Sequence, residues 1–243
     1  METAFVFLDE TGRLPVPRDR FFGVGIIKIP EPAVIQRPLQ RMRDQKEFRA
    51  EMKWGEVRLN TIPIYKQALS YFFDRPDAKF ACFISDKDVM DPSKRFGNQW
   101  RAYERLAAQL LIGNIKPGEQ VIVLADEYSS PPTETFEENL KAQVDKRLQR
   151  DAICGVCRMG STGVDLFSIL DILLGAVAYD YKLNAGLITG HNPKMRMLTH
   201  IKNRFGIDTF VGGHHLDKLN VKEFGSAARA ATGNGKRLKL LRR

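Results

Sequence analysis

The stretch FVFLDE (residues 5–10) decides the fold class, together with a second stretch of the same design, VIVLADE (residues 121–127). Each is an apolar run of strand length that ends in a pair of acidic residues. Such a run, closed by turn-forming residues, indicates a buried strand. In an open α/β sheet, ligands gather at the carboxyl ends of strands, so these acids are candidate ligands. The alternative is that the acids merely favour the turns that end the strands.

A third acid stands in the apolar segment LFSILDILLGAVAY (residues 166–179). Ser168, Asp171, Gly175 and Ala178 are spaced by three, four and three residues, which places them in one stripe along a helix. A charge on a nearly buried helix must be paired or bind a metal, so Asp171 predicts either a salt bridge or hydrogen bond, or a metal ligand. We expect Gly175 to let this helix pack close to the sheet.

The remaining chain alternates strand and helix patterns. Apolar runs predict further strands at 22–29, 79–84 and 152–158, and segment 51–55 is a candidate for a short one. Helical spacing predicts helices at 64–73, 100–111, 135–148, 165–182 and 194–205. Segment 36–49 is polar and basic, which fits an exposed helix or an extended arm. We therefore predict an α/β fold, a mixed sheet flanked by helices over residues 1–185. Residues 186–243 are expected to pack on the same domain as an extension with a basic tail.

Carboxylates from two strand ends and one helix can bind Mg²⁺ or Mn²⁺ through oxygen. Two such ions about 4 Å apart would activate water and stabilise the leaving oxygen in phosphodiester cleavage. Side chains alternate along a strand, so Asp9 is expected to point inward while Glu10 helps or faces solvent. Asp86 also follows an apolar run, and it competes with Asp126 for the role of the second strand ligand.

The motifs FLDETG (7–12), EMKWG (51–55) and SILDILLGA (168–176), with the strand that ends at Asp126, resemble the family called domain of unknown function 3800. The resemblance covers residues 4–180 and implies an RNase H-like fold with a metal-dependent nuclease-type site. It implies that Asp9, Asp126 and Asp171 hold the metal, with Glu10 beside them. Glu51 and Lys53 would match the second motif, also in the catalytic site. The family's helix motif more usually has Gln where this chain has Ser168.

The charge of the chain points to a polyanionic partner. Lys and Arg exceed Asp and Glu by nine, and Lys236, Arg237, Lys239, Arg242 and Arg243 lie in the last eight residues. A basic surplus attracts nucleic acid, so RNA or DNA is the expected partner. The three cysteines, the start METAFVFLDETG and the acids within the most apolar segment predict a cytoplasmic protein without a membrane anchor. The CxxC spacing of Cys154 and Cys157 is expected to be structural, because no second pair accompanies it.

These observations predict a divalent-metal-dependent phosphodiesterase that acts on RNA or DNA. The alternative is a nucleic-acid-binding or interaction protein with a degenerate RNase H-like site.

Overall fold

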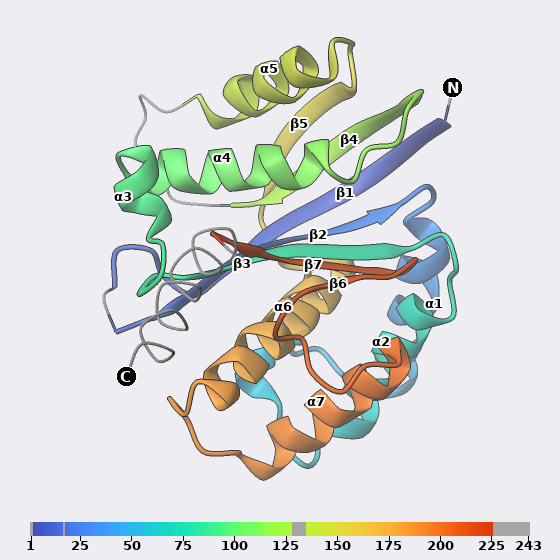
Figure 1. Cartoon of the computed structure of the whole chain (residues 1–243). Helices are drawn as coiled ribbons and strands as arrows, with labels where there is room; N and C mark the ends of the chain where they lie inside the picture. Colours follow the sequence, from blue (N-terminus) through green and yellow to red (C-terminus); the bar gives the residue numbers. More distant parts are fainter. Residues whose placement is uncertain (1, 17, 128–134, 226–243) are drawn as a thin grey trace, which may run out of the picture.

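A seven-stranded sheet forms the centre of the protein, which a computed structural model describes for residues 2–16, 18–127 and 135–225 (Figure 1). The strands follow the spatial order β5-β4-β1-β2-β3-β7-β6. Their bounds are β1 (Glu2–Thr11), β2 (Phe21–Ile29), β3 (Lys79–Asp86), β4 (Glu119–Asp126), β5 (Ile153–Met159), β6 (His214–His215) and β7 (Leu219–Phe224).

The direction of the strands sets where the acids lie. β2 is antiparallel to both β1 and β3, whereas β4 runs parallel to β1, and β5 runs parallel to β4. The carboxyl ends of β1 and β4 therefore lie at the same edge of the sheet. Their parallel register pairs Leu8 with Ala125, so the next residues along the two strands are Asp9 and Asp126.

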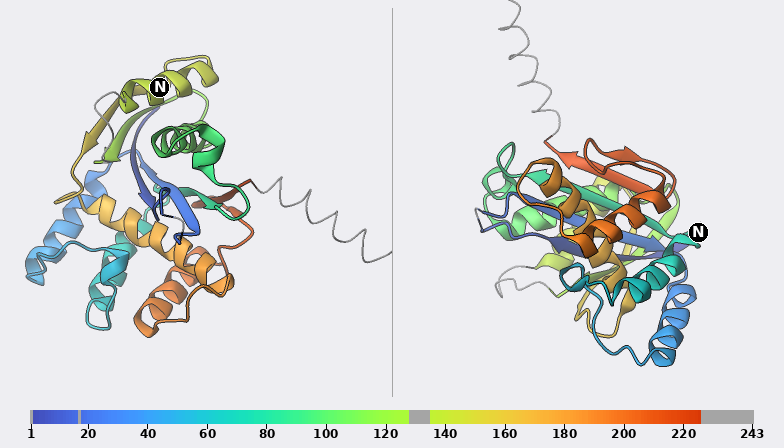
Figure 2. Two further views of the ribbon diagram at one scale, coloured as in Figure 1. Left: turned by 90° about the vertical axis from the view of Figure 1, so that its left-hand side faces the viewer. Right: turned by 90° about the horizontal axis from the view of Figure 1, so that it is seen from below.

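Helices cover both faces of the sheet (Figures 1 and 2). One face carries α3 (Pro92–Phe96), α4 (Gln99–Ile112) and α5 (Phe136–Leu148). The other face carries α1 (Ala33–Gln45), α2 (Ile62–Phe73), α6 (Asp165–Asn184) and α7 (Asn192–Phe205), with a short 3₁₀ turn, η1 (Trp54–Glu56). This mixed sheet flanked by helices confirms the α/β fold that the sequence predicts.

Helix α6 packs directly on the centre of the sheet. The rings of Phe7 and Phe167 meet edge to face at 5.4 Å, and a Cβ added to Gly25 of β2 would lie 2.9 Å from Cδ1 of Leu174. The missing side chain at Gly25 therefore lets the helix approach the sheet. Each fully buried Leu, Ile or Phe contributes roughly 1.5–3 kcal/mol. The many such residues of α6 hold its one partly exposed acid, Asp171, in a defined position.

The role expected for Gly175 is wrong. A Cβ at Gly175 would lie 2.4 Å from both Cβ and Cγ of Trp54, so this glycine admits the indole of η1 rather than the sheet. The possible strand at 51–55 is likewise not a strand, because its last two residues begin η1. The close approach to the sheet that the sequence assigned to Gly175 belongs to Gly25 instead.

The segment after α6 contributes more to the fold than its sequence suggested. α7 confirms the expected helix, but the chain beyond it forms β7, which pairs in parallel with β3, and β6, which closes this edge of the sheet. The basic residues at 236–243 lie outside the described residues. No helix in the described part of the chain has the length and apolarity needed to cross a bilayer.

Candidate functional site

Asp9 and Asp126 point to the face of the sheet that α6 covers. Asp9 follows Phe7 by two residues, and Phe7 packs on α6; Asp126 likewise follows Leu124, which packs in the same apolar cluster. Asp9 is 9% exposed. Each carboxylate accepts a hydrogen bond from the next backbone N–H, at 2.7 Å from Glu10 to Asp9 and at 2.8 Å from Glu127 to Asp126. The two strand ends thus present their acids in the same local geometry.

Asp171 faces the same space from α6 and is held by η1. Its Oδ2 accepts a 2.6 Å hydrogen bond from the backbone N–H of Trp54. The indole of Trp54 packs against Gly175, one helical turn further along, and meets the ring of Tyr179 at 5.5 Å. The segment that contains Glu51 and Lys53 is thereby fixed beside Asp171.

Glu51 and Lys53 form an ion pair at the border of this group. Their charged atoms are 3.1 Å apart, and Ser161 Oγ donates a 3.4 Å hydrogen bond to Glu51 Oε1. The pKa of Lys53 is raised first by its hydrogen bond to Glu51, and also by the negative charges of Asp171 and Asp126. Lys53 therefore lies within the field of both acids.

Burial and mutual repulsion disfavour the ionised form of Asp9. Its pKa is raised well above the ordinary value, first by burial and then by the charges of Glu10, Asp126 and Asp171, against the lowering effect of the Glu10 N–H. Four carboxylates from β1, β4 and α6 thus lie within electrostatic reach of one another. A bound cation would relieve this repulsion.

Glu10 and Asp171 share this environment. Burial, followed by the charge of Asp126, raises the pKa of Glu10 to about 7. Burial also raises the pKa of Asp171, and the charges of Glu51 and Asp126 raise it further, whereas the Trp54 N–H and Lys53 lower it. The six residues that the sequence placed in one site are therefore brought together by the fold, with Lys53 as the cation paired among them.

The donor chemistry of this group suits a hard divalent cation, because every candidate ligand is a carboxylate oxygen. Among the described residues, however, no three His, Cys, Asp or Glu side chains are arranged as ligands around one metal position. The fit with Mg²⁺ or Mn²⁺ therefore rests on ligand type and on the excess of negative charge.

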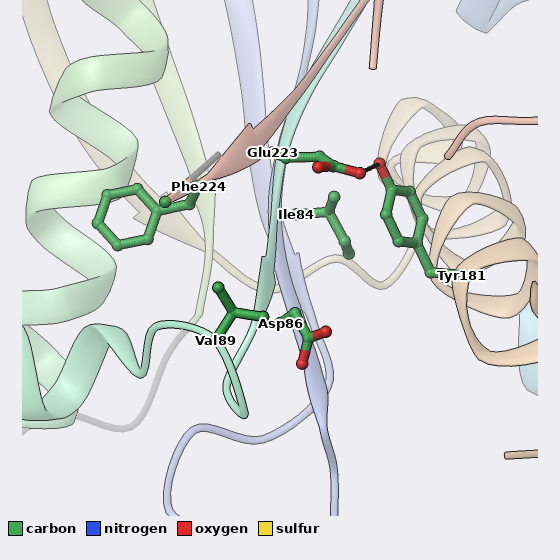
Figure 3. Close-up of a pocket in the computed structure, with 7 residues that line it drawn as sticks. Ile84, Asp86, Val89, Tyr181, Glu223 and Phe224 are labelled. Carbon is green, nitrogen blue, oxygen red and sulfur yellow. Dashed lines mark hydrogen bonds between the residues drawn. The ribbon is translucent and has the colours of Figure 1, made fainter. Parts of the chain in front are cut away.

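Asp86, the rival of Asp126, lies elsewhere. β3 is separated from β1 by β2, so the strand that ends at Asp86 is not a neighbour of the strand that carries Asp9. Both oxygens of Asp86 accept hydrogen bonds from Arg20, at 2.8 and 2.7 Å. Asp86 borders a small pocket together with Tyr181 and Glu223, which are hydrogen-bonded at 3.0 Å (Figure 3). This neutralised carboxylate is not grouped with Asp9.

The structure also places Ser168 and the two cysteines of the CxxC spacing. Ser168, which replaces the usual Gln, is buried on α6. Cys154 and Cys157 are exposed free thiols on β5. The register of β5 against β4 shifts between Ile153 and Gly155, so Cys154 is an extra residue and the alternation of side chains is interrupted there. The structural role expected for the two cysteines stays a prediction.

One candidate residue was missed. Nζ of Lys194, on α7, lies 5.9 Å from the ring of Trp54 and 6.0 Å from that of Tyr179. Burial lowers the pKa of Lys194, and the charge of Asp171 opposes this effect. No motif marks this lysine, because its position depends on how α7 packs beside α6.

No protein-family model matches the chain, and no curated protein matches it. Among solved structures, it aligns with a chain of the PCNA:RNase HII complex from Archaeoglobus fulgidus at 9% identity and a TM-score of 0.44, covering 87% of this chain and 96% of that one. It also aligns with the ribonuclease H2 of Pyrococcus horikoshii OT3 at 14% identity and a TM-score of 0.49, covering 84% of this chain and 90% of that one. Likenesses at this level say nothing about the activity of this chain, and the resemblance to the family of unknown function stays a prediction.

Proposed function

We propose that this protein is a divalent-metal-dependent phosphodiesterase that cleaves RNA or DNA. The observation that supports this most is the group formed by Asp9, Glu10, Asp126 and Asp171 at the carboxyl edge of β1 and β4. Uncompensated carboxylates that are partly buried cost stability, and catalytic sites are where such arrangements recur. Asp9, Asp126 and Asp171 would hold Mg²⁺ or Mn²⁺.

The bound ions would supply charge stabilisation for the scissile phosphate and a lowered pKa for the attacking water. The chain itself supplies the positions. The Glu10 and Glu127 N–H groups orient Asp9 and Asp126, and the Trp54 N–H orients Asp171. Lys53 lies within the electrostatic reach of Asp126 and Asp171. From this position its ammonium would contact a phosphate oxygen of the substrate.

The second candidate is a nucleic-acid-binding or interaction protein whose site no longer works. It is favoured by the absence, among the described residues, of three side chains arranged around one metal position. On this reading Glu51 and Lys53 neutralise each other and Asp171 serves only to accept the Trp54 N–H.

Cleavage assays separate the two. Wild-type protein is incubated with single-stranded RNA, duplex DNA, single-stranded DNA and an RNA–DNA hybrid, with Mg²⁺, Mn²⁺ or a chelator. We expect metal-dependent cleavage of at least one substrate, with a loss of at least about 100-fold in the Asp9→Asn and Asp171→Asn variants, because each removes a charge from the metal position.

Asp44→Asn is the matched control, since Asp44 is an exposed carboxylate on α1 that pairs with Arg49. It should leave cleavage unchanged. Binding of nucleic acid without cleavage under any metal condition would favour the second candidate. Cleavage that survives in both Asp9→Asn and Asp171→Asn would refute the assignment of the site.

A further inference from the structure

A cleft lies at the opposite edge and on the opposite face of the sheet from the carboxylate group. It has a volume of about 390 Å³ and is lined by residues from the end of α4, the start of β3 and the β6–β7 hairpin. Glu119 begins β4 beside it, whereas Asp126 ends β4 in the carboxylate group. At about 3.3 Å per residue, the two sites are separated by roughly 20 Å along this strand.

Lysines surround this cleft. Lys28, 7% exposed, lies at its floor, where Nζ donates to Glu119 and to the carbonyl of Asn114, both at 2.6 Å. Lys79 pairs at 2.6 Å with Asp217, whose side chain is 88% exposed. Exposed pairs of this kind contribute little, so the charge of Lys79 stays available to a ligand.

Two more lysines lie beside the lining residues Asn114 and Gly113. Lys116 lines the cleft and is exposed, and a Cβ added to Gly113, another lining residue, would lie 3.7 Å from Nζ of Lys222. Within the described part of the chain, neither Lys116 nor Lys222 forms an ion pair. The positive charges of Lys79 and Lys116 both lower the pKa of Lys28, after the larger effect of burial, which confirms that the three lie within reach of one another.

The wall of the cleft also holds an acceptor without a partner. Asn220 is 7% exposed; its Nδ2 donates to Asn114 Oδ1 at 3.0 Å, but its own Oδ1 has no hydrogen bond within the described residues. A buried amide oxygen of this kind is stabilised by a ligand that brings an N–H or O–H. Three residues of the apolar cluster that includes α4, namely Ile26, Ala81 and Ile115, also line the cleft.

We infer that this cleft binds a nucleoside phosphate: Lys79, Lys116 and Lys222 hold the phosphate, and Asn220 meets a donor on the base or sugar. The volume falls within the range of small-molecule sites, and it exceeds what a lone phosphate would fill. A lining of cations, amides and a few apolar groups suits a ligand with an anionic end and a ring that carries hydrogen-bond donors. The site is independent of the phosphodiesterase proposal, because it shares no residue with the carboxylate group.

Calorimetric titration of the full chain with AMP and GMP, adenosine, guanosine and inorganic phosphate tests the inference. We expect at least one of the two nucleotides to bind about tenfold more tightly than either its nucleoside or phosphate alone. The Lys116→Ala/Lys222→Ala variant should lose about tenfold in nucleotide affinity, because it removes two charge-assisted contacts. Asp217→Asn should gain roughly two- to fivefold, since it frees Lys79.

Asn220→Ala should weaken nucleotide binding while leaving phosphate binding unchanged. Lys146→Ala/Arg147→Ala is the matched control, because it removes two exposed cations that line a different cleft, between α4 and α5. A nucleotide affinity that is absent, equal to that of phosphate, or unchanged in Lys116→Ala/Lys222→Ala overturns the inference. Metal-dependent cleavage by this last variant should match the wild type, so failure here is distinguishable from failure of the proposed activity.

Discussion

The backbone N–H of Trp54 donates a 2.6 Å hydrogen bond to Oδ2 of Asp171, across 117 residues of sequence. This bond ties η1 to the centre of α6. It gives the acid a partner that remains when no metal is present, and it sets the position of the neighbouring Glu51–Lys53 pair. The close contact between Trp54 and Gly175 makes the arrangement possible.

Gly175→Ala tests that contact. An alanine in a helix gains up to about 1 kcal/mol over glycine, but a Cβ 2.4 Å from Trp54 forces the indole to move, at a cost of about 1–3 kcal/mol or more. We expect Tm to fall by roughly 2–4 °C for each kcal/mol of net loss, and cleavage to fall with it. Gly155→Ala is the control for thermal unfolding, since a Cβ there meets nothing within 4 Å. An unchanged Tm in Gly175→Ala would contradict the packing described.

Asp9→Asn should raise the stability of the metal-free protein. It removes one charge from a repelling group, while the amide oxygen can still accept the Glu10 N–H. Mg²⁺ or Mn²⁺ should raise the Tm of the wild type, because a ligand of the folded state stabilises it, and the variant should lose most of this rise. Melting curves with and without metal check both points. A variant that is less stable without metal and responds fully to it would mean that Asp9 is a structural residue.

The stability of the metal-free protein should fall as pH rises from about 4.5 to about 7. Burial and Asp126 raise the pKa of Glu10 to about 7, so the folded state binds more protons than the unfolded state in this window. The contribution of Glu10 reaches at most about 3 kcal/mol. His200 acts in the opposite sense, because burial lowers its pKa. Denaturant unfolding of the wild type and of Glu10→Gln gives the free energy of unfolding of each protein across this pH window. His200 is present in both, so its contribution cancels in the difference between them. If the two curves of unfolding free energy against pH are parallel, Glu10 is excluded as the cause.

Nucleic-acid binding should weaken steeply with salt. Each phosphate neutralised on duplex DNA adds roughly 0.9 to the slope of log affinity against log salt. Removal of residues 236–243 takes away five cations at once, namely Lys236, Arg237, Lys239, Arg242 and Arg243. Affinities measured over a salt series should give a flatter slope for the shortened chain. An identical slope would exclude these residues as contacts.

Cys154→Ser with Cys157→Ser should leave cleavage intact and stability within about 0.5 kcal/mol of the wild type, because both thiols are exposed on β5. Elemental analysis of the purified protein accompanies the assay. Bound zinc that is present in the wild type and lost in the variant would contradict this expectation.

Local patterns were enough to predict much of the framework. The apolar runs before Asp9 and Asp126 are strands, and the segment around Asp171, which is apolar on all sides, is a buried helix. The spacing of apolar residues over a short stretch indicates both the type of element and whether it is buried, so these elements could be predicted locally. The same patterns placed an acid at each strand end. They could not distinguish Asp126 from Asp86, since both follow apolar runs.

Only the tertiary structure decided between those two acids. The strand order places β4 beside β1 and inserts β2 before β3, so Asp126 follows the residue paired with Leu8 of β1, while Asp86 pairs with Arg20. It also decided that Gly25, not Gly175, lets α6 approach the sheet, and that residues 219–224 form β7. These outcomes depend on which distant segments of the chain pack against one another. The spacing of residues within one segment carries no information about its distant partner, so the sequence patterns could not predict them. The sequence by itself therefore determined the candidate residues, and the fold determined which of them lie near one another.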